Sequence, residues 1–487
     1  EYIEAHATST QVGDATELAA LSRLLAKHLP AGRQIPIGSV KANIGHTLET
    51  AGIASLVKVV LAMEHGLIPP GSTCTEFNPE FDWRNGPFRV PREPVAWPAH
   101  GDGTPRSAAV NAFGIGGLNV HVSLAEHLPA STPAVAGAPA RDPEADAIAI
   151  VGAGCVLPGS LSLDAFFERL DRGETAIGPV PADRWQAARA LDRSGPRTWH
   201  TLADQGGFIR GFAYDWRRHK VPPKQIAAAN PLQFMLLEAA DAAIAEAGGP
   251  QAGLDRTRTG VVVGTLFGGE FANQLQMGLR LPETGRLLRE LLARRGLAAA
   301  DIDRVIEGYE KKVLEKLPAL IDETGSFTSS TLASRLTKTF DLMGGALALD
   351  AGDCSSVSAL SAAVDMLRQR TCDAVICAAG ERSMDLMAFQ DRSLGGNLGA
   401  GPTSVVEGRR DGGEVPGEGA VVLVLKRLAD ARAAGNTIRG VIRGVSLGSG
   451  RAVTEVARRV VREACEQAAV AAQAVRAVAV ASAAGRE

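Results

Sequence analysis

The segment EAHATST, residues 4–10, places His6 on a loop of small residues directly after an apolar pair. A second segment, KANIGH at 41–46, places His46 on a similar loop, after an apolar run and before a helical pattern. No cysteine precedes them, and the cysteine-bearing segment LDAGDCSSVSAL (349–360) follows about three hundred residues later. This order predicts the back half of one domain, then a linker, then the front half of a second domain.

The composition bounds the class of protein. The chain has 487 residues, 45% of them hydrophobic, and this length predicts about two to four domains or parts of domains. Its net charge of −3, with no basic stripe, argues against nucleic-acid binding, and no apolar run reaches the length of a membrane span. Six cysteines without a CxxC pair favour a reduced, cytoplasmic setting. The first residues read as the middle of a strand, so we expect a fragment of a longer protein.

Residues 1–127 alternate short apolar runs with helical patterns, which predicts part of a layered α/β domain. One helix is expected from Asp14, with Glu17 three residues on as a capping-box pair. A second helix is expected from about Thr47 to Gly66. The apolar face expected for it comprises Ile53, Leu56, Val60 and Met63.

The remaining residues are expected to form a linker and a second domain part. Residues 128–145 are rich in Pro and Ala and show no periodicity, which is typical of a semi-extended linker. In residues 146–487, strand-like runs alternate with helical patterns, which again predicts α/β architecture. The charged, amphipathic stretch at about 280–320 is interpreted as a helical insertion.

Two histidines that each follow a β-run can face one shared site, and their neighbours carry matching chemistry. Lys41 lies five residues before His46, and the glycine loop NAFGIGGLN (111–119) can present backbone N–H groups to an oxyanion. One such histidine alone is more often structural, but the second histidine, Lys41 and the glycine loop together favour a catalytic role. EAHATST, SVKANIGH and NAFGIGGLNVHV resemble the patterns EAHGTGT, KxNIGH and FGFGGTN(A/G)H, which belong to the second half of a β-ketoacyl synthase, a thiolase-like condensing enzyme.

The resemblance implies a layered αβαβα thiolase-like fold and a decarboxylative Claisen condensation. A cysteine thiolate takes the acyl chain as a thioester, malonyl thioester loses CO2, and the resulting enolate attacks the acyl carbonyl. By resemblance, His6 and His46 would stabilise the enolate oxygen, with Lys41 holding the electrostatics of His46. The implied oxyanion loop comprises Gly114, Ile115 and Gly116.

Two residues of this loop depart from the family pattern. Ile115 stands where many relatives have a gating Phe, and Leu118 stands where they have Thr. The backbone N–H groups survive both changes, but the shape and gating of the pocket need not follow the family. The nucleophile that would act with these histidines is expected upstream of Glu1.

The rest of the chain resembles the first half of a second ketosynthase-like domain. The matching segments are AIAIVGAGCVLPGS (147–160), VPADRW (180–185), NPLQFMLLEAADAAIAEAG (230–248) and GEVPGEGAVVLVLKRL (413–428). The family's nucleophile segment reads DTACSSSLVAL, and its alignment with residues 350–360 puts Asp353 on the nucleophile and Cys354 one position later. One residue turns a helical side chain by about 100°, and a carboxylate cannot form the acyl thioester. Asp353 and Cys354 are therefore interpreted as a degenerate nucleophile region.

The end of the chain fits the same interpretation. AVAVASAAGRE (477–487) aligns with the opening segment so that Ser482 replaces the histidine. A domain that keeps the fold without the catalysis resembles a chain-length factor, the inactive partner that shapes the acyl tunnel. A ketosynthase followed by such a domain resembles a subunit of a bacterial polyunsaturated fatty acid synthase, and residues 4–18 and 317–345 carry that finer likeness.

The resemblance also implies partners. The substrates, malonyl and acyl thioesters, would ride on the phosphopantetheine of an acyl carrier protein, and the missing halves of both ketosynthase domains would complete the folds. No bound cofactor and no metal are expected. Two alternatives stay open: a structural module without activity, which supplies interface and tunnel walls, and a modular polyketide synthase with Cys354 as nucleophile. A degradative thiolase is disfavoured, since it has no KxNIGH-type segment.

Overall fold

A computed structural model describes most of the chain in two compact units, Glu1–Ala140 (unit 1) and Arg141–Glu487 (unit 2). The described residues are 1–25, 27–30, 32–71, 74, 76–114, 119–128, 146–249, 254–316, 328–396, 398, 415–471 and 474–475. The expected linker, apart from Leu128, lies outside them, as do Ile115, Gly116, Leu118 and Ser482.

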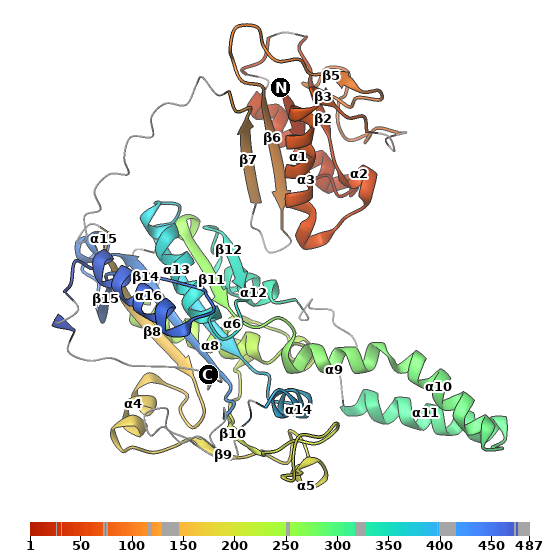
Figure 1. Ribbon diagram of the computed structural model, residues 1–487, viewed down its shortest axis with the longest axis vertical. Helices are drawn as coiled ribbons and strands as arrows, with labels where there is room; N and C mark the ends of the chain where they lie inside the picture. The colour runs from red at the N-terminus through yellow and green to blue at the C-terminus, as the bar shows by residue number, and fades with distance from the viewer. Residues whose placement is uncertain are drawn as a thin grey trace. The chain divides into compact units, whose positions relative to one another are not determined.

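Unit 1 contains a five-stranded sheet with the order β4-β2-β1-β6-β7 (Figure 1). Its first four strands are parallel and β7 runs antiparallel to β6. The bounds are β1 (Tyr2–Glu4), β2 (Ile35–Gly38), β4 (Phe88–Arg89), β6 (Ser107–Phe113) and β7 (Asn119–Ala125). Because parallel strands end at one edge of a sheet, the segments that follow β1, β2 and β6 meet there. These are the two histidine segments and the glycine loop.

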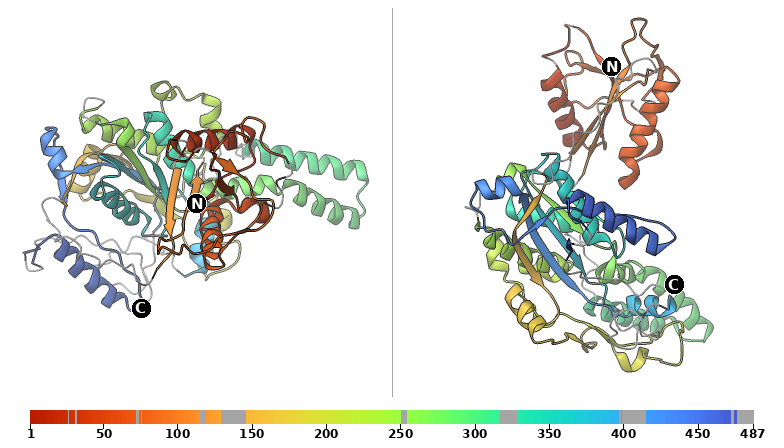
Figure 2. Two further views of the ribbon diagram at one scale, coloured as in Figure 1. Left: turned by 90° about the horizontal axis from the view of Figure 1, so that it is seen from above. Right: turned by 60° about the vertical axis from the view of Figure 1, so that its left-hand side comes forward.

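Helices cover both faces of this sheet (Figure 2, right). Successive strand residues point to opposite faces, so Tyr2 packs with Val59 of α3 (Ala51–Glu64) and Ile3 packs with Leu18 of α1 (Gln11–Leu25). The shorter elements of the unit are α2 (Lys41–Ile44), the 3-10 helix η1 (Leu48–Thr50), β3 (Leu67–Ile68) and β5 (Val95–Ala96).

Two details of unit 1 differ from the sequence-based expectations. Helix α1 begins at Gln11, three residues before Asp14, so Glu17 is not a capping residue. Helix α3 buries Val59 and Met63, whereas Ile53 is 63% exposed. The helix is apolar on most of its surface, and therefore its periodicity alone does not identify the side that meets the sheet.

Unit 2 contains a six-stranded mixed sheet with the order β12-β11-β13-β14-β8-β15. The three strands β12, β11 and β13 are parallel, and the other neighbours are antiparallel. The bounds are β8 (Ile148–Val156), β11 (Thr259–Gly264), β12 (Ala346–Leu349), β13 (Ala374–Glu381), β14 (Gly419–Arg427) and β15 (Gly440–Ile442). The runs that predicted strands in this part of the sequence are confirmed as β8, β11, β13 and β14.

Two large clusters of apolar side chains cover the two faces of this sheet. One contains α8 (Leu232–Glu246) and α12 (Ser330–Phe340), and the other contains α13 (Ser355–Arg368). Glycines allow the close approach: a Cβ at Gly154 would stand 2.1 Å from the Ala239 carbonyl oxygen of α8, and one at Gly264 would stand 2.3 Å from that of Ser355. The layered α/β architecture expected from the sequence is therefore confirmed in unit 2.

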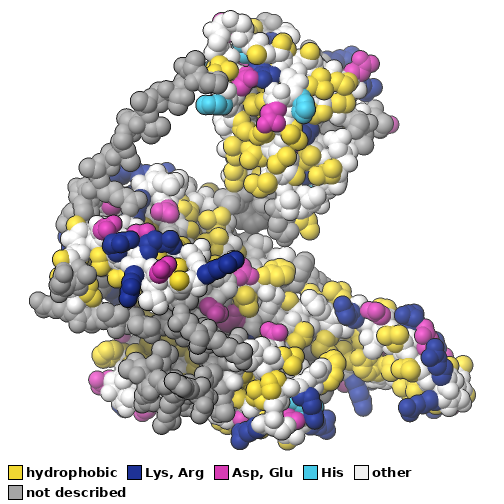
Figure 3. All heavy atoms as spheres, viewed as in Figure 1, with side chains coloured by type: hydrophobic (Ala, Val, Ile, Leu, Met, Phe, Trp, Pro, Cys, Tyr) yellow, Lys and Arg dark blue, Asp and Glu magenta, His cyan; other side chains and the backbone are white. Residues whose placement is uncertain are grey.

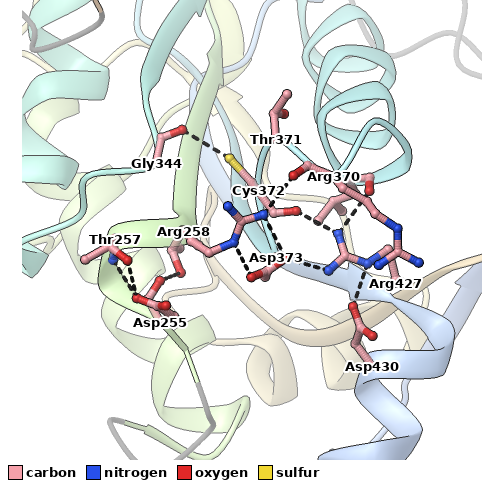
Figure 4. Close-up of polar contacts among 12 residues, drawn as sticks. Asp255, Thr257, Arg258, Gly344, Arg370, Thr371, Cys372, Asp373, Arg427 and Asp430 are labelled. Carbon is pink, nitrogen blue, oxygen red and sulfur yellow. Dashed lines mark hydrogen bonds and ion pairs between the residues drawn. The ribbon is translucent and has the colours of Figure 1, made fainter. Parts of the chain in front are cut away.

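An ion cluster fastens the sheet of unit 2 at the edge where β11 and β13 begin (Figure 4). The Asp373 carboxylate contacts Arg258 at 2.5 Å and Arg427 at 2.6 Å, and Arg427 also donates to the Cys372 carbonyl oxygen at 2.7 Å. The hydrogen bonds from Arg258 and Arg427 lower the pKa of Asp373 to about 2, against the opposing effect of its partial burial. This clasp lies at the opposite edge from the nucleophile-like segment, which follows the carboxyl end of β12.

The remaining helices and two short strands lie around the sheet of unit 2. Among them, α10 and α11 form a hairpin that projects from the unit (Figure 1; Figure 2, left). They confirm the helical insertion expected at about 280–320. The bounds are α4 (Leu163–Asp171), β9 (Ile177–Pro179), α5 (Ala187–Ala190), β10 (Gln205–Gly207), α6 (Trp216–His219), α7 (Pro223–Ala228), η4 (Arg256–Arg258), α9 (Gly269–Leu279), α10 (Leu281–Arg294), α11 (Ala299–Lys316), α14 (Leu386–Leu394), α15 (Leu428–Ala433) and α16 (Val453–Gln467). Among the described residues, no helix has the length and apolar character needed to cross a membrane.

Candidate active site

His6 lies two residues beyond the end of β1, and a buried carboxylate holds its backbone. Glu17 of α1 accepts from the N–H of His6 at 2.9 Å and from the N–H of Ala7 at 3.0 Å. The same carboxylate accepts from the side-chain amide of Asn111 on β6 at 2.8 Å. Glu17 therefore joins α1, the His6 loop and β6 at one point.

The ring of His6 is oriented by the strand that leads into the glycine loop. Its Nδ1 accepts from the backbone N–H of Phe113 at 3.3 Å, and the two rings lie 5.3 Å apart between centroids. Since Nδ1 is the acceptor, the neutral ring carries its proton on Nε2. Gly114 follows Phe113 directly, so the described start of the expected oxyanion loop lies beside His6.

Lys41, the first residue of α2, contacts His6. Its Nζ donates to the His6 carbonyl oxygen at 2.6 Å. Burial, reinforced by the Lys41 ammonium, lowers the pKa of His6, which Glu17 opposes. Burial also lowers the pKa of Lys41, against the attraction of Glu4 and Glu17. The structure thus gives Lys41 a contact with His6, and its expected influence on His46 stays a prediction.

His46 lies on the exposed turn between α2 and α3, and its ring meets that of His6. The two rings are 5.9 Å apart between centroids and nearly perpendicular, at 86°. The Nδ1 of His46 accepts from the backbone N–H of Leu48 at 3.1 Å. The neutral His46 ring therefore also carries its proton on Nε2. Both histidines consequently present an Nε2–H donor, while their Nδ1 atoms are occupied by the backbone.

A buried carboxylate two residues before His6 links the two histidine segments. Glu4 is fully buried; it accepts from the Tyr2 hydroxyl at 2.6 Å, from Lys58 Nζ at 2.8 Å and from the backbone N–H of Val40. Val40 immediately precedes Lys41. One side chain therefore fixes the end of β1 relative to the turn that carries Lys41.

Three residues beside the histidines hold a backbone conformation that glycine prefers. Ala7 has a φ of 33°, Ser9 has a φ of 62° and Leu48 has a φ of 48°. A left-handed conformation costs a non-glycine residue about 1–2 kcal/mol, and such strain is concentrated at functional sites. The first two stand where the EAHGTGT pattern has glycine.

The nucleophile-like segment in unit 2 is built differently. Asp350, at the carboxyl end of β12, accepts from the N–H of Phe267 at 2.7 Å. Asp353 and Cys354 are exposed, and Cys354 is the N-cap residue of α13. The left-handed residue of this turn is Gly352, with a φ of 58°, so no non-glycine residue carries the strain.

A second ion cluster lies in the same unit, close to where β14 begins. Arg184 contacts Glu270 at 2.6 Å and also Glu418, and Arg382 approaches Glu418 at 3.4 Å. Glu418 is fully buried and accepts from the N–H of Ile209 at 2.7 Å. Because each carboxylate faces an arginine, this cluster fastens the loops around the sheet and leaves no charge unpaired.

Sequence reasoning found the two histidines, Lys41 and the glycine loop, but it missed the residues that hold them. Glu17 was interpreted as a helix cap, and no role was given to Glu4 or Asn111. The signal available for Glu4 is a carboxylate inside a buried strand, which requires a partner. Among the described residues, no group of three or more His, Cys, Asp or Glu side chains could hold a metal ion.

The arrangement in unit 1 can stabilise negative charge on an oxygen. Two N–H donors from neighbouring loops suit the stabilisation of an oxyanion or enolate. Among the described residues, no carboxylate contacts the Nε2 atom of His6 or of His46. Both Nε2–H groups are therefore available to a substrate.

Comparison with known proteins agrees with this geometry. Curated relatives include the spectinabilin polyketide synthase protein NorA of Streptomyces orinoci, 43% identical over 127 residues, and the pikromycin polyketide synthase component PikAIII of Streptomyces venezuelae, 38% identical over 197 residues. These matches cover 26% and 39% of this chain and only 7% and 12% of the relatives.

Solved structures share the fold. One titled PfaC keto synthase–chain length factor aligns with a TM-score of 0.76 at 24% identity, over 96% of this chain and 48% of that one. The oxazolomycin ketosynthase domain OzmH KS7 of Streptomyces albus JA3453 aligns with a TM-score of 0.52 at 25% identity, over 66% of this chain and 50% of that one. The fold is therefore thiolase-like, as expected from the sequence.

Family profiles match residues up to 431, and a C-terminal domain precedes an N-terminal one. The C-terminal domain of β-ketoacyl synthases matches residues 1–75, the ketoacyl-synthetase C-terminal extension matches 78–145, and the N-terminal domain of β-ketoacyl synthases matches 145–431. Since the last of these alone covers more than half of the sequence, the chain belongs to the β-ketoacyl synthase family.

Proposed function

We propose that unit 1 supplies the histidine half of a condensing enzyme that catalyses decarboxylative Claisen condensation. The malonyl thioester loses CO2, and the electron pair of the broken C–C bond becomes an enolate whose charge rests on the thioester oxygen. The Nε2–H groups of His6 and His46 donate to that oxygen. The enolate carbon then attacks an acyl thioester, the C–C bond forms, and the cysteine thiolate leaves.

The observation that carries this proposal is the matched state of the two histidines. Each Nδ1 accepts a backbone N–H, from Phe113 for His6 and from Leu48 for His46, and the rings meet edge to face at 5.9 Å. Adjacent loops thereby each present an Nε2–H group as a hydrogen-bond donor. The lowered pKa of His6 supports its neutral state, since a protonated ring would lose the Phe113 contact.

We further propose the organisation in which these units act. Residues 1–127 are the C-terminal half of one ketosynthase domain, 128–145 a linker, and 146–487 the N-terminal half of a second, within a subunit of a polyunsaturated fatty acid or polyketide-type synthase. The order of the family matches and the fold likeness to a ketosynthase–chain-length-factor pair support it. The exposed apolar residues Ile53 and Val57 of α3 support a missing half-domain that packs there.

The second domain is proposed to be inactive and to shape the acyl tunnel. Asp353 stands at the position that the family pattern gives to the nucleophile, and a carboxylate does not form the thioester. The relaxed turn at Gly352 supports this reading, because nucleophile turns are sites where strain is maintained. The acyl-accepting cysteine is proposed to lie in the polypeptide that precedes Glu1 in the parent protein.

A second candidate function has one observation in its favour. Cys354 is exposed and is the N-cap residue of α13, so its thiol is accessible to a substrate. It could serve as the nucleophile of a modular polyketide synthase. A module without activity, which only supplies interface and tunnel walls, is the remaining alternative.

The substrates of the proposed reaction arrive on the phosphopantetheine arm of an acyl carrier protein. The curated relatives are polyketide synthases, which supports this class of substrate and partner. A cytoplasmic setting stays a prediction from the cysteine pattern.

The test uses the parent polypeptide with malonyl and acyl carrier proteins, following CO2 release and mapping the acyl adduct by mass spectrometry. We expect His6→Ala and His46→Ala each to lower CO2 release by about 10²–10³-fold, the effect of removing one oxyanion donor. The acyl group is expected on a cysteine upstream of Glu1. Full rates in both histidine variants contradict the proposal, and an acyl group on Cys354 assigns the second candidate function instead.

A further inference from the structure

The α10–α11 hairpin has a defined inner side. Leu281 and Gly285 of α10 are buried, as are Ile302 and Ile306 of α11. A Cβ at Gly285 would lie 3.5 Å from Ile306, so the two helices approach closely at this level. These contacts fix which side of each helix meets the other, and hence which sides remain free.

The two broad faces of the hairpin differ in character. On one face Arg289 of α10 pairs with Asp303 of α11 at 2.6 Å. With 100° between successive residues, the opposite face carries Leu287, Leu291 and Val305. Their exposed fractions are 45%, 57% and 46%. We call these three residues the apolar stripe; Figure 3 shows hydrophobic side chains along the hairpin, with both basic and acidic side chains around them.

The apolar stripe is bordered by basic side chains without counter-charges. Arg280 at the base of the hairpin, Arg295 near its tip and Lys312 on α11 are exposed, and none of them has an ion-pair partner among the described residues. Helical geometry places two acidic residues on this side, Glu283 of α10, four residues before Leu287, and Asp301 of α11, which pairs with Arg304. An apolar strip with an unpaired basic border complements an acidic amphipathic surface.

We propose that the apolar stripe and its basic border bind an acidic helical protein domain, namely the acyl carrier protein that delivers the thioester. This inference rests on the proposed function for the identity of the partner. Exposed leucines on a charged helix would supply the contact area, and the arginines and lysine would pair with carboxylates of the partner's helix.

The hairpin is also connected to the reactive end of unit 2. The N–H of Phe267 donates to Asp350 of the nucleophile-like segment at 2.7 Å, and α9 begins two residues later. Its 11 residues span about 16 Å at 1.5 Å per residue and lead directly to Arg280. A carrier domain bound at the base of the hairpin is thus within about one helix length of the turn before α13.

The experiment measures binding of the 487-residue chain to a fluorescently labelled, phosphopantetheinylated acyl carrier protein at low and high salt. We expect Leu287→Asp with Leu291→Asp to weaken binding at least about tenfold. Arg295→Glu with Lys312→Glu should weaken it as well and flatten the salt dependence, since these charges would no longer attract the acidic partner. The second pair replaces only exposed polar side chains, so it tests the surface even if the aspartates disturb the hairpin.

Two matched controls separate this surface from general effects. Arg286→Glu makes the same charge change on α10, on a side chain already paired with Glu290, and Val461→Asp on α16 alters a residue as exposed as Leu291. Both should bind like the unaltered chain. Circular dichroism checks that every variant keeps its helix content.

Three outcomes would overturn the proposal. The first is no measurable binding of the carrier protein, and the second is an equal loss of binding in the control variants. The third is a chain that forms a dimer through the apolar stripe, which light scattering would detect as a mass that Leu287→Asp with Leu291→Asp halves. Binding does not require catalysis, so it distinguishes this inference from the proposed function. If the parent synthase condenses at its normal rate with the hairpin substitutions, the docking surface alone is refuted. If the carrier protein binds as expected but His6→Ala and His46→Ala keep full rates of CO2 release, the proposed reaction alone is refuted.

Discussion

The histidine loops of unit 1 and the cysteine turn of unit 2 occupy the same kind of place, the carboxyl ends of parallel strands, but they are built in opposite ways. Around His6, buried Glu4 and Glu17 together accept six hydrogen bonds from side chains and backbone. Around Cys354, the side chains of 351–354 are exposed and the left-handed residue is a glycine.

This difference indicates which of the two loops is held in a fixed conformation by its surroundings. Unit 1 retains three strained residues, Ala7, Ser9 and Leu48, beside its histidines, and strain persists only where the surroundings over-determine the conformation. In unit 2 the left-handed residue of the cysteine turn is a glycine, so the turn carries no such strain. The ion cluster around Asp373 lies at the opposite edge of its sheet. Such a division is expected when one unit orients reacting groups and the other supports the fold.

The largest effect is expected from Glu4→Gln. The amide leaves Lys58, whose side chain is 11% exposed, without its counter-charge in a buried setting. Breaking a buried pair costs about 3–5 kcal/mol, so the free energy of unfolding of unit 1 should fall by that amount. Amide hydrogen exchange at Val40, measured by mass spectrometry, should accelerate accordingly.

The control for Glu4→Gln is the double variant Glu4→Gln with Lys58→Met. Removing the orphaned ammonium should recover a large part of the lost stability, because an apolar side chain of similar length fits the site. A double variant as unstable as the sum of both single variants would contradict the view that the ion pair is the source of the effect.

A smaller loss is expected in unit 2 from Asp373→Asn. Its partners Arg258 and Arg427 keep other hydrogen bonds, and the Asp373 side chain is 41% exposed, so solvent screening reduces the effect to about 1–2 kcal/mol. The pKa of Asp373 is lowered to about 2. Its stabilisation is therefore present above the ordinary Asp range near pH 4 and is lost as the pH falls towards 2.

Urea denaturation of the unaltered chain and Asp373→Asn across this pH range checks the prediction. The two should differ at pH 7 and converge near pH 2. A difference that stays constant with pH would show that Asp373 acts through packing and not through its charge.

The backbone strain at the two sites can be compared by introducing a glycine at one of them and removing a glycine from the other. Ala7→Gly should stabilise unit 1 by up to about 1 kcal/mol, the relief of a left-handed residue less the greater freedom of glycine in the unfolded chain. Gly352→Ala should destabilise unit 2 by about 1 kcal/mol. A Cβ at Gly352 meets no atom within 4 Å, so the cost there is conformational and not steric. Denaturation midpoints measure both, and changes of the same sign would break the comparison.

The histidine and glycine motifs could be predicted to lie together because each follows one of three neighbouring parallel strands, which stand in the sheet order β2-β1-β6. His6, Lys41 and Gly114 follow β1, β2 and β6, three parallel strands, and short connections bring such residues together. The prediction stopped at the supporting residues. Glu17 is the seventh residue of a helix that begins at Gln11, so the Asp14–Glu17 spacing, which fits a capping box, gave the wrong role.

Helix faces show the same limit. The residues of α3 are apolar on several sides, and only tertiary contacts decide that Val59 meets the sheet while Ile53 and Val57 stay exposed. The contact between Lys41 and the His6 carbonyl was likewise beyond reach, because it depends on how the turn after β2 is tied to β1 by Glu4. Long-range backbone hydrogen bonds leave no periodic trace in a sequence.

The smallest effect, and the most direct test of the histidine site, concerns the pKa of His6. Burial lowers it and the Lys41 ammonium lowers it further. Lys41→Met removes the like charge, so the pKa of His6 should rise, whereas Lys41→Arg keeps the charge and should leave it lowered. NMR titration of the imidazole resonances measures both variants against the unaltered chain.

The sign of the stability effect follows from the same shift. A histidine whose pKa is lower in the folded state binds fewer protons there than in the unfolded chain, so stability is lost as the pH falls below the ordinary histidine value near 6.5. With Lys41→Met that acid loss should become smaller, because the folded and unfolded pKa values move closer together. An unchanged His6 pKa in this variant would mean that burial alone keeps the ring neutral, and Lys41 would then act only as the anchor of the His6 carbonyl.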